Sequence, residues 1–273
     1  DWRTSLKHLH TLWKQLRKGE GSSRMILDNK QNHQGPFEIF FRNDTALGLR
    51  IQNLVEKDMD ELFNCDILTD KATSLIKYLL QGEVPTEWNG LWRGPQDITA
   101  WMSGLICRRK YLERDVTVYQ QPFILANVYN PSTFLSSFQQ HTAKLRNCRM
   151  DELKLSILWE HKNSLDLTEH NNISDDQRMT IILEGIMIQG AIFWDKNLTD
   201  IPADEKDLLP MPVGILQYSL KSDPDQTRSL NCISLPVYID SGRSQMVGYW
   251  DVPCKSDDEE KWILAGVALM LQK

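Results

Sequence analysis

The sequence predicts an α+β protein: a bundle of about five helices, residues 1–148, followed by an antiparallel β-barrel of about six strands, residues 149–273. Three observations favour this order. Apolar residues recur at helical spacing up to about residue 146, they fall in short strand-like runs after Met150, and no clear helical pattern separates those runs. We expect the two subdomains to form one domain of a larger chain.

Start and stop signals define the helical half. Thr69 and Asp70 are suited to cap a helix that Gly82 ends, and Asn130-Pro131 is a favourable helix start. Residues 22–36 are polar and predict a loop. The predicted helices span residues 2–16, 37–63, 70–80, 97–112 and 130–146.

A tryptophan-rich connector, Pro85–Asp97, joins the third and fourth predicted helices. Trp88 and Trp92 are candidates for a ligand box or for platforms on which nucleic-acid bases stack. The competing interpretation is a loop held by two large side chains packed between helices. We favour packing, because buried aromatic side chains dominate core energetics.

A basic triplet, Arg108–Lys110, interrupts the apolar stripe of the helix predicted over residues 97–112. Such a triplet is a weak signal for a phosphate site. We therefore expect it to form a solvated helix face.

The stretch Leu183–Asp195 organises the strand half. It is rich in isoleucine and interrupted by Gly185 and Gly190, which favours a strand over a helix. Because it is apolar on both faces, we expect one central strand. The glycines predict a bulge or the close approach of another backbone segment.

The remaining strands lie on both sides of this stretch. Asp240–Arg243 predicts a hairpin turn between two of them. The segment after Trp262 has the composition of a helix, but its valine and glycine content and its neighbours favour a closing strand. A barrel would hide the sheet edges. The other predicted strands span residues 153–160, 211–220, 232–239, 245–252 and 262–271, with a polar loop at 161–177 and an acidic loop at 256–260.

Composition and charge exclude several classes of protein. The sequence has 273 residues and a net charge of −6, with +2 on residues 1–160 and −8 on residues 161–273, which argues against nucleic-acid or anionic-membrane partners in the second half. The five cysteines form no C-x-x-C pair and indicate reduced thiols in a cytosolic setting. No membrane-spanning run or signal peptide occurs. The sequence begins at Asp1 inside a helical pattern, so we expect it to be a piece of a longer protein.

No pattern of catalytic chemistry stands out. The P-loop, the dinucleotide-binding G-x-G-x-x-G and the G-x-S-x-G elbow do not occur. His8 and His10 are two residues apart on a helix and do not face one metal ion. Cys232 and Cys254 lie in neighbouring strands, where burial is more common than zinc binding. The predicted catalytic, cofactor-binding and metal-binding residues are therefore none.

Short motifs in the strand half resemble the C-terminal segment of dynein heavy chains. The run GIMIQGAIFWD within Leu183–Asp195 resembles G-[L/V]-x-L-x-G-[A/C]-x-[W/F]-[D/N], and Leu209–Pro212 resembles an LPxxP-like step. Ile233–Tyr238 resembles the family's PVY strand, with Arg243 in the following turn. Trp262–Leu269 resembles the ending W-I-x-x-G-V-A-L.

Upstream motifs extend the resemblance in order across roughly residues 85–273. Asn130–Gln139 is similar to F-x-P-x-x-F-L-x-x-x-x-Q, Pro85–Trp88 with Trp92 is similar to the P-x-x-W step, and the helix at Trp2–Leu16 suits the family's lead-in. The ISLPVY strand, the DVPC step and the WRGPQD connector most resemble the intraflagellar-transport class. Asn127–Tyr129 replaces the bulkier aromatic run of axonemal dyneins.

The resemblance implies a non-catalytic C-terminal domain that packs on the ATPase ring of a microtubule motor and modulates it. ATP and magnesium would bind the parent ring and not this fragment. The implied parent is a minus-end-directed motor of the cytoplasm, cytoskeleton and cilium. Its implied partners are microtubules, light and intermediate chains and intraflagellar transport particles, with no nucleic acid or membrane.

Two alternatives remain beside the ring-packing domain. One is a β-barrel that binds a small ligand or peptide, with Trp194 or Trp250 at its mouth and no motor role. The other is a hydrolase whose histidine and aspartate residues cannot be paired by spacing. The ring-packing hypothesis predicts an exposed apolar patch, on the helices, in the isolated fragment.

Overall fold

The computed structural model describes residues 1–18, 35–65, 67–113, 122–160, 180–200, 208–223, 231–255 and 259–271. Its contacts group the protein into a helical unit, Asp1–Val116 with Asn127–Tyr129, and a strand unit, Thr117–Ala126 with Asn130–Lys273. Among the described helices, none is both long and apolar enough to cross a membrane. The division into subdomains at residue 148 stays a prediction, and most of the predicted loops at 22–36, 161–177 and 256–260 lies outside the described residues.

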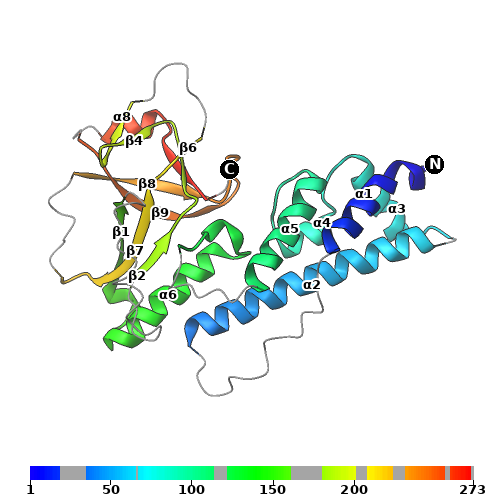
Figure 1. The fold of residues 1–273 in the computed structure, drawn as a ribbon, viewed down its shortest axis with the longest axis horizontal. Coiled ribbons are helices and arrows are strands. Elements are labelled where there is room, and N and C mark those ends of the chain that lie inside the picture. Colours follow the sequence, from blue (N-terminus) through cyan, green and yellow to red (C-terminus); the bar gives the residue numbers. More distant parts are fainter. Residues whose placement is uncertain are drawn as a thin grey trace. The chain divides into compact units, whose positions relative to one another are not determined.

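The helical unit confirms four of the predicted helices and adds one (Figure 1). The addition, α4, lies in the tryptophan-rich connector, which was expected to be a loop. It has only six residues, too few for an apolar period to show in the sequence. The α-helices of this unit are α1 (Trp2–Arg17), α2 (Pro36–Asn64), α3 (Asp70–Leu80), α4 (Thr86–Leu91) and α5 (Ile98–Glu113).

Caps read from the sequence begin these helices. The Thr69 hydroxyl accepts a hydrogen bond from the Ala72 N–H at 3.2 Å, and Asp97 accepts one from the Ala100 N–H at 2.8 Å. Hydrogen bonds from Thr99 and the Ala100 backbone hold the pKa of Asp97 below its ordinary value. These bonds satisfy backbone donors that a helix start otherwise leaves unpaired.

The strand unit begins with helical elements and continues as strands. The 3₁₀ helix η1 (Leu125–Asn127) straddles the two units, α6 (Pro131–Arg146) follows, and η2 (Met150–Glu152) precedes the first strand. The strands are β1 (Leu153–Glu160), β2 (Thr180–Leu183), β3 (Met187–Gln189), β4 (Ile192–Trp194), β5 (Asn197–Thr199), β6 (Leu209–Pro210), β7 (Val213–Leu220), β8 (Cys232–Tyr238), β9 (Met246–Pro253) and β10 (Ala268–Met270).

The strands form three open sheets, so the predicted barrel is wrong. The sheet orders are β1-β7-β2, β6-β3-β10-β8-β9 and β4-β5. The β8–β9 hairpin is antiparallel as predicted, and the Arg243 N–H closes its turn on the Asp240 carbonyl at 3.1 Å. However, β10 runs parallel to β8, so the sheet is mixed and not purely antiparallel.

The single central strand expected over Leu183–Asp195 is also wrong. The stretch contains β3 and β4 and the end of β2, each in a different sheet. Gly185 and Gly190 have φ angles of +80° and +86°, which turn the backbone out of extended geometry between the pieces. A Cβ on Gly190 would lie 3.3 Å from the Cα of Val267, so the predicted close approach of another backbone segment is confirmed.

The closing segment is part helix and part strand. Residues Glu259–Leu264 form α8, which takes the end of the loop expected at 256–260 and the first part of the strand expected at 262–271, and only Ala268–Met270 is strand. Gly266, at φ +67°, donates its N–H to the Ile263 carbonyl, and the Val267 N–H bonds the Trp262 carbonyl at 3.1 Å. This pair of bonds is a Schellman motif, which ends the helix and releases the backbone into β10.

Candidate functional site

The tryptophan connector is a packing element. Trp88 and Trp92 are buried, and the Trp88 indole N–H donates to the Asp58 carboxylate at 2.8 Å. Both indole rings lie against the buried Trp101, with ring centroids 5.9 and 5.4 Å away. The interpretation as helix-packing anchors is therefore confirmed, and the rings offer no open face for a base.

The basic triplet Arg108–Lys110 is not the solvated helix face that the sequence predicted. Lys110 is exposed, but Arg108 and Arg109 are only 4% and 5% exposed, so the expected solvated face is wrong for both arginines. The Arg108 guanidinium lies 4.6 Å from the Trp92 ring centroid and donates to the Val128 carbonyl at 3.3 Å. Burial lowers the pKa of Arg108. The buried cation is held by carbonyl oxygens and an aromatic face, and it serves packing.

Residues Asn127–Tyr129 belong to the helical unit through a buried hydrogen-bond network. The Tyr129 N–H donates to the Asp44 carboxylate at 2.8 Å, and the Tyr129 hydroxyl donates to the Leu105 carbonyl at 2.8 Å. Burial raises the pKa of this hydroxyl. A Cβ on Gly48 would lie 2.7 Å from the Tyr129 ring, so glycine leaves room for the aromatic side chain.

A pocket of about 320 Å³ lies where α2 ends and α3 begins; we name it the α2–α3 pocket. Ile67, which lines the pocket and is 82% exposed, lies in the connection between the two helices, so the apolar patch expected on the helices stays a prediction. Its lining comprises Asp58, Glu61, Leu62, Asn64, Cys65, Ile67, Thr69, Lys71, Ala72 and Leu75.

Asp58 anchors the pocket wall. One carboxylate oxygen accepts from the Lys71 ammonium at 2.7 Å and the other from the Trp88 indole. Asp58 is buried, whereas the Lys71 side chain is half exposed. The hydrogen bond to Asp58 raises the pKa of Lys71. The carboxylate thus ties α2 to both α3 and α4.

The strand unit holds the motif arginine in a structural position. The Arg243 guanidinium donates to the Gln189 side chain at 2.8 Å and to the Gly266 carbonyl at 2.5 Å. It joins the β8–β9 turn to the end of β3 and to the turn before β10. Its role in the described residues is to join these segments.

The two tryptophans expected at a barrel mouth lie in different environments. Trp250 is 2% exposed and its ring lies near Trp159, whereas Trp194 is 72% exposed at the end of β4. Without a barrel, they do not line a common opening. The ligand-binding alternative therefore loses the geometry on which it rested.

The histidines and cysteines form no metal centre in the part of the protein that the structure describes. The His10 ring stacks on Phe63 at 4.1 Å, and burial lowers its pKa. The predicted burial is confirmed for Cys254 and is only partial for Cys232, and neither forms a disulfide with another described cysteine. Burial raises the pKa of Cys232 to about 11.

Two buried carboxylates that the sequence analysis did not single out stabilise the helical unit. Asp44 and Asp58 are 2% and 3% exposed on α2, at positions in register with its buried apolar residues. A carboxylate on the apolar face of a helix is a readable signal, because a buried charge requires a partner. The partners themselves, Tyr129 and Trp88, are 85 and 30 residues away and could not be read from local spacing.

Known proteins with similar sequences agree with the motif-based resemblance. Residues 4–271 match the family described as the C-terminal domain of the dynein heavy chain. The protein is 26% identical to cytoplasmic dynein 2 heavy chain 1 of Tripneustes gratilla and 24% identical to that of Homo sapiens, each over 99% of its own length and 6% of the relative. It is 30% identical to dynein axonemal heavy chain 9 of Homo sapiens over 75% of its own length and 4% of the relative. It thus spans about 6% of the length of its dynein 2 relatives, and it belongs to the family of C-terminal domains of dynein heavy chains.

Proposed function

We propose that this protein is the non-catalytic C-terminal domain of a microtubule motor heavy chain of the intraflagellar-transport dynein class. It packs on the ATPase ring of the same heavy chain and modulates the ring's activity. The observation that carries this proposal is the similarity to cytoplasmic dynein 2 heavy chains over 99% of the sequence. The shorter match to an axonemal heavy chain supports the class more weakly.

The geometry supports a role in packing. The motif residues Trp88, Trp92 and Arg243 contribute to the core or join segments of the fold. Exposed apolar side chains lie on both units, at Ile67 and at Trp194. Single exposed apolar side chains are common on protein surfaces, so the packing proposal rests on the sequence similarity and not on these two residues.

The properties of the parent motor follow as part of the proposal. ATP and magnesium bind the ring outside these 273 residues, and the motor acts in the cytoplasm, cytoskeleton and cilium. Its complex includes microtubules, light and intermediate chains and intraflagellar transport particles.

Truncation tests the proposal. The complete heavy chain and a heavy chain that ends just before Asp1 are compared for ATP turnover, with and without microtubules, at equal motor concentration. We expect turnover to differ between them while the truncated motor still hydrolyses ATP. Equal turnover and equal velocity on microtubules would contradict a modulating role, and complete loss of hydrolysis in a correctly folded ring would contradict a non-catalytic one.

A further inference from the structure

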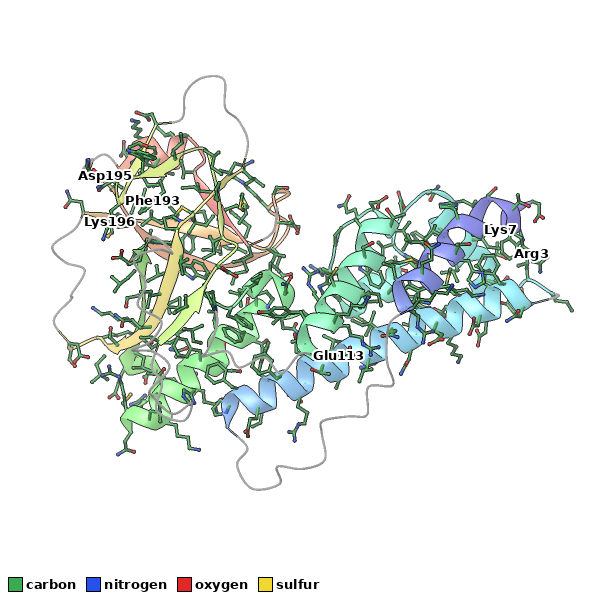
Figure 2. The ribbon with its side chains drawn as sticks, viewed as in Figure 1. Arg3, Lys7, Glu113, Phe193, Asp195 and Lys196 are labelled. Atoms are coloured by element: carbon green, nitrogen blue, oxygen red, sulfur yellow. The ribbon has the colours of Figure 1, made fainter. Side chains whose placement is uncertain are left out.

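The exposed side of α1 carries a row of basic side chains. Arg3, Lys7, Lys14 and Lys18 are all exposed, and at 3.6 residues per turn they lie within an arc of about 60° and span about 22 Å along the helix. Figure 2 shows Arg3 and Lys7 on the first turns of α1. No acidic residue occurs between Trp2 and Lys18. We name the four cations the basic stripe of α1.

The stripe is not neutralised by ion pairs in the described part of the protein. Its three lysines form no ion pair with any described residue, whereas Arg17, outside the stripe, is paired with Glu56. The Arg3 guanidinium donates to the Cys65 carbonyl, a neutral group, at 2.5 Å. The basic stripe therefore keeps its positive charge.

The groups that neighbour the stripe leave this surface positive. Of the described carboxylates, Asp1 caps α1, and Asp60 on α2 acts by its charge on the nearby His10. One further cation, Lys110 on α5, donates to the Leu16 carbonyl at 3.4 Å. Five cations thus face these two carboxylates, and the net charge of this surface is positive.

The spacing of the stripe is unfavourable for a helix without a partner. Each end of the stripe has two cations four residues apart, the separation at which like charges on a helix repel each other. The same unit uses this spacing for attraction elsewhere, in the Lys57–Glu61 pair at 3.7 Å. Carboxylates placed along the stripe would remove the repulsion and add attraction.

The rest of α1 favours a polypeptide as the source of those carboxylates. Leu6, Leu9 and Trp13 are buried in the helical unit, so they are not available for insertion into a membrane. Trp2 lies against Phe63 with ring centroids 5.9 Å apart, and the stripe itself contains no aromatic residue on which a nucleic-acid base could stack. A row of aspartate or glutamate side chains matches the charge and the length of the stripe.

We infer that the basic stripe of α1 docks on a row of carboxylates of the motor ring of the same heavy chain. Exposed ion pairs are individually weak, so a few of them hold a separate partner only at roughly millimolar concentration. A partner joined covalently to this domain reaches an effective concentration of the same order, about millimolar. The strength of the contact therefore favours the parent heavy chain over a separate protein. The inference rests on the proposed packing of this domain on its own ring, and it names the face that meets the ring and the chemistry of its partner.

Site-specific photo-crosslinking in the complete heavy chain tests the inference. Thr11, which is exposed and lies between Lys7 and Lys14 on the same side of α1, is replaced by p-benzoylphenylalanine. Mass spectrometry identifies the cross-linked peptides. We expect a ring peptide outside residues 1–273 that carries several aspartate or glutamate residues. Cross-links to a second copy, to another protein or to a ring peptide without carboxylates would overturn the inference, and so would the absence of any cross-link outside residues 1–273.

Charge reversal provides the second arm. Lys7→Glu combined with Lys14→Glu in the photo-reactive protein should lower the yield of that cross-link about tenfold, because it places like charges together. Lys77→Glu combined with Lys144→Glu is the matched control. It changes the net charge equally at exposed lysines of α3 and α6 and should leave the yield within about twofold.

Hydrogen exchange of α1 establishes that the stripe variant is folded. If it is not, Lys7→Gln combined with Lys14→Gln takes its place, with an expected decrease of about threefold. A yield that the stripe variants do not change, or that falls equally in the control, would overturn the inference.

A lysine-reactive cross-linker, read only at lysines outside α1, separates this inference from the proposed function. If it joins residues 1–273 to the ring while the Thr11 probe does not, the domain packs on the ring through another surface and only the inference about the stripe fails. If neither reagent joins the two, the packing itself is contradicted.

Discussion

The helical unit and the strand unit stabilise their interiors in different ways. Asp44, Asp58 and Arg108 are buried in the helical unit, and each is bound to backbone or to an aromatic partner. The described strands of the strand unit have no buried charged side chain, and apolar residues fill their inward faces. Glycines with positive φ instead direct the path of the backbone there. The comparison teaches that specific polar pairs define the packing of the helices, whereas backbone turns define which strands meet.

The largest effect is expected from removing a buried polar pair. Asp58→Ala leaves the Trp88 indole N–H without its acceptor and should lower the free energy of unfolding of the helical unit by about 3 kcal/mol. Denaturant unfolding followed by hydrogen exchange in each unit measures this loss. Asp60→Ala, an exposed position on the same helix, is the control and should change stability by less than about 0.5 kcal/mol. An equal decrease in the free energy of unfolding in both variants would show that the Asp58–Trp88 pair makes no specific contribution.

A backbone change should have a smaller effect, and in the strand unit. Gly190→Ala places a Cβ at φ +86° and 3.3 Å from Val267, which should cost about 1–2 kcal/mol. Gly248→Ala, in β9 with open space around it, is the matched strand control and should be nearly neutral. The same unfolding measurement applies, and a neutral Gly190→Ala would show that the turn does not depend on glycine.

High pH should weaken the strand unit through one buried phenol. Burial raises the pKa of Tyr218 to about 12 from an ordinary value of 10. Because the folded protein keeps this proton longer than the unfolded polypeptide, the stability contribution is complete below pH 10 and is lost as pH rises from 10 to 12. By about pH 11 the loss is about 1 kcal/mol. Tyr218→Phe should not show this component, and identical pH profiles for the two proteins between about pH 9 and 11 would contradict the burial.

Thiol reactivity compares one cysteine of each unit in the unaltered protein. The half-buried Cys232, with its pKa raised to about 11, should react with iodoacetamide at about pH 8 roughly 100-fold more slowly than a thiol of ordinary pKa. Cys107, which is exposed on α5, is the internal reference. Mass spectrometry of both peptides over time measures the ratio, and equal rates would place Cys232 in a more open environment than the structure shows.

The helices could be predicted from the sequence because their signals are local. Thr69 and Asn130 precede the observed starts of α3 and α6, and Gly82 follows the observed end of α3. The burial of Arg108 could not be predicted, because its hydrogen-bond acceptor, the Val128 carbonyl, is brought close only by the fold. The same holds for the α2–α3 pocket, which exists only where two helices meet.

The sheets were harder to predict for a related reason. The sequence shows that Gly185 and Gly190 interrupt an apolar run, but not that each piece joins a different sheet. The parallel pairing of β10 with β8 connects residues about thirty positions apart, with α8 between them. The longer strands β1, β7, β8 and β9 were therefore readable from the sequence, whereas the short strands and the pairing of strands depended on contacts distant in sequence.

The most direct test of the account adds residues 1–273 back to a motor ring truncated just before Asp1. Circular dichroism first establishes that the added fragment is folded, and association is measured by sedimentation together with the ATP turnover of the ring. The account predicts that the fragment binds the ring and shifts its turnover toward that of the complete heavy chain. A folded fragment that neither binds the ring nor changes its turnover, at concentrations up to roughly those a covalent tether provides, would contradict it.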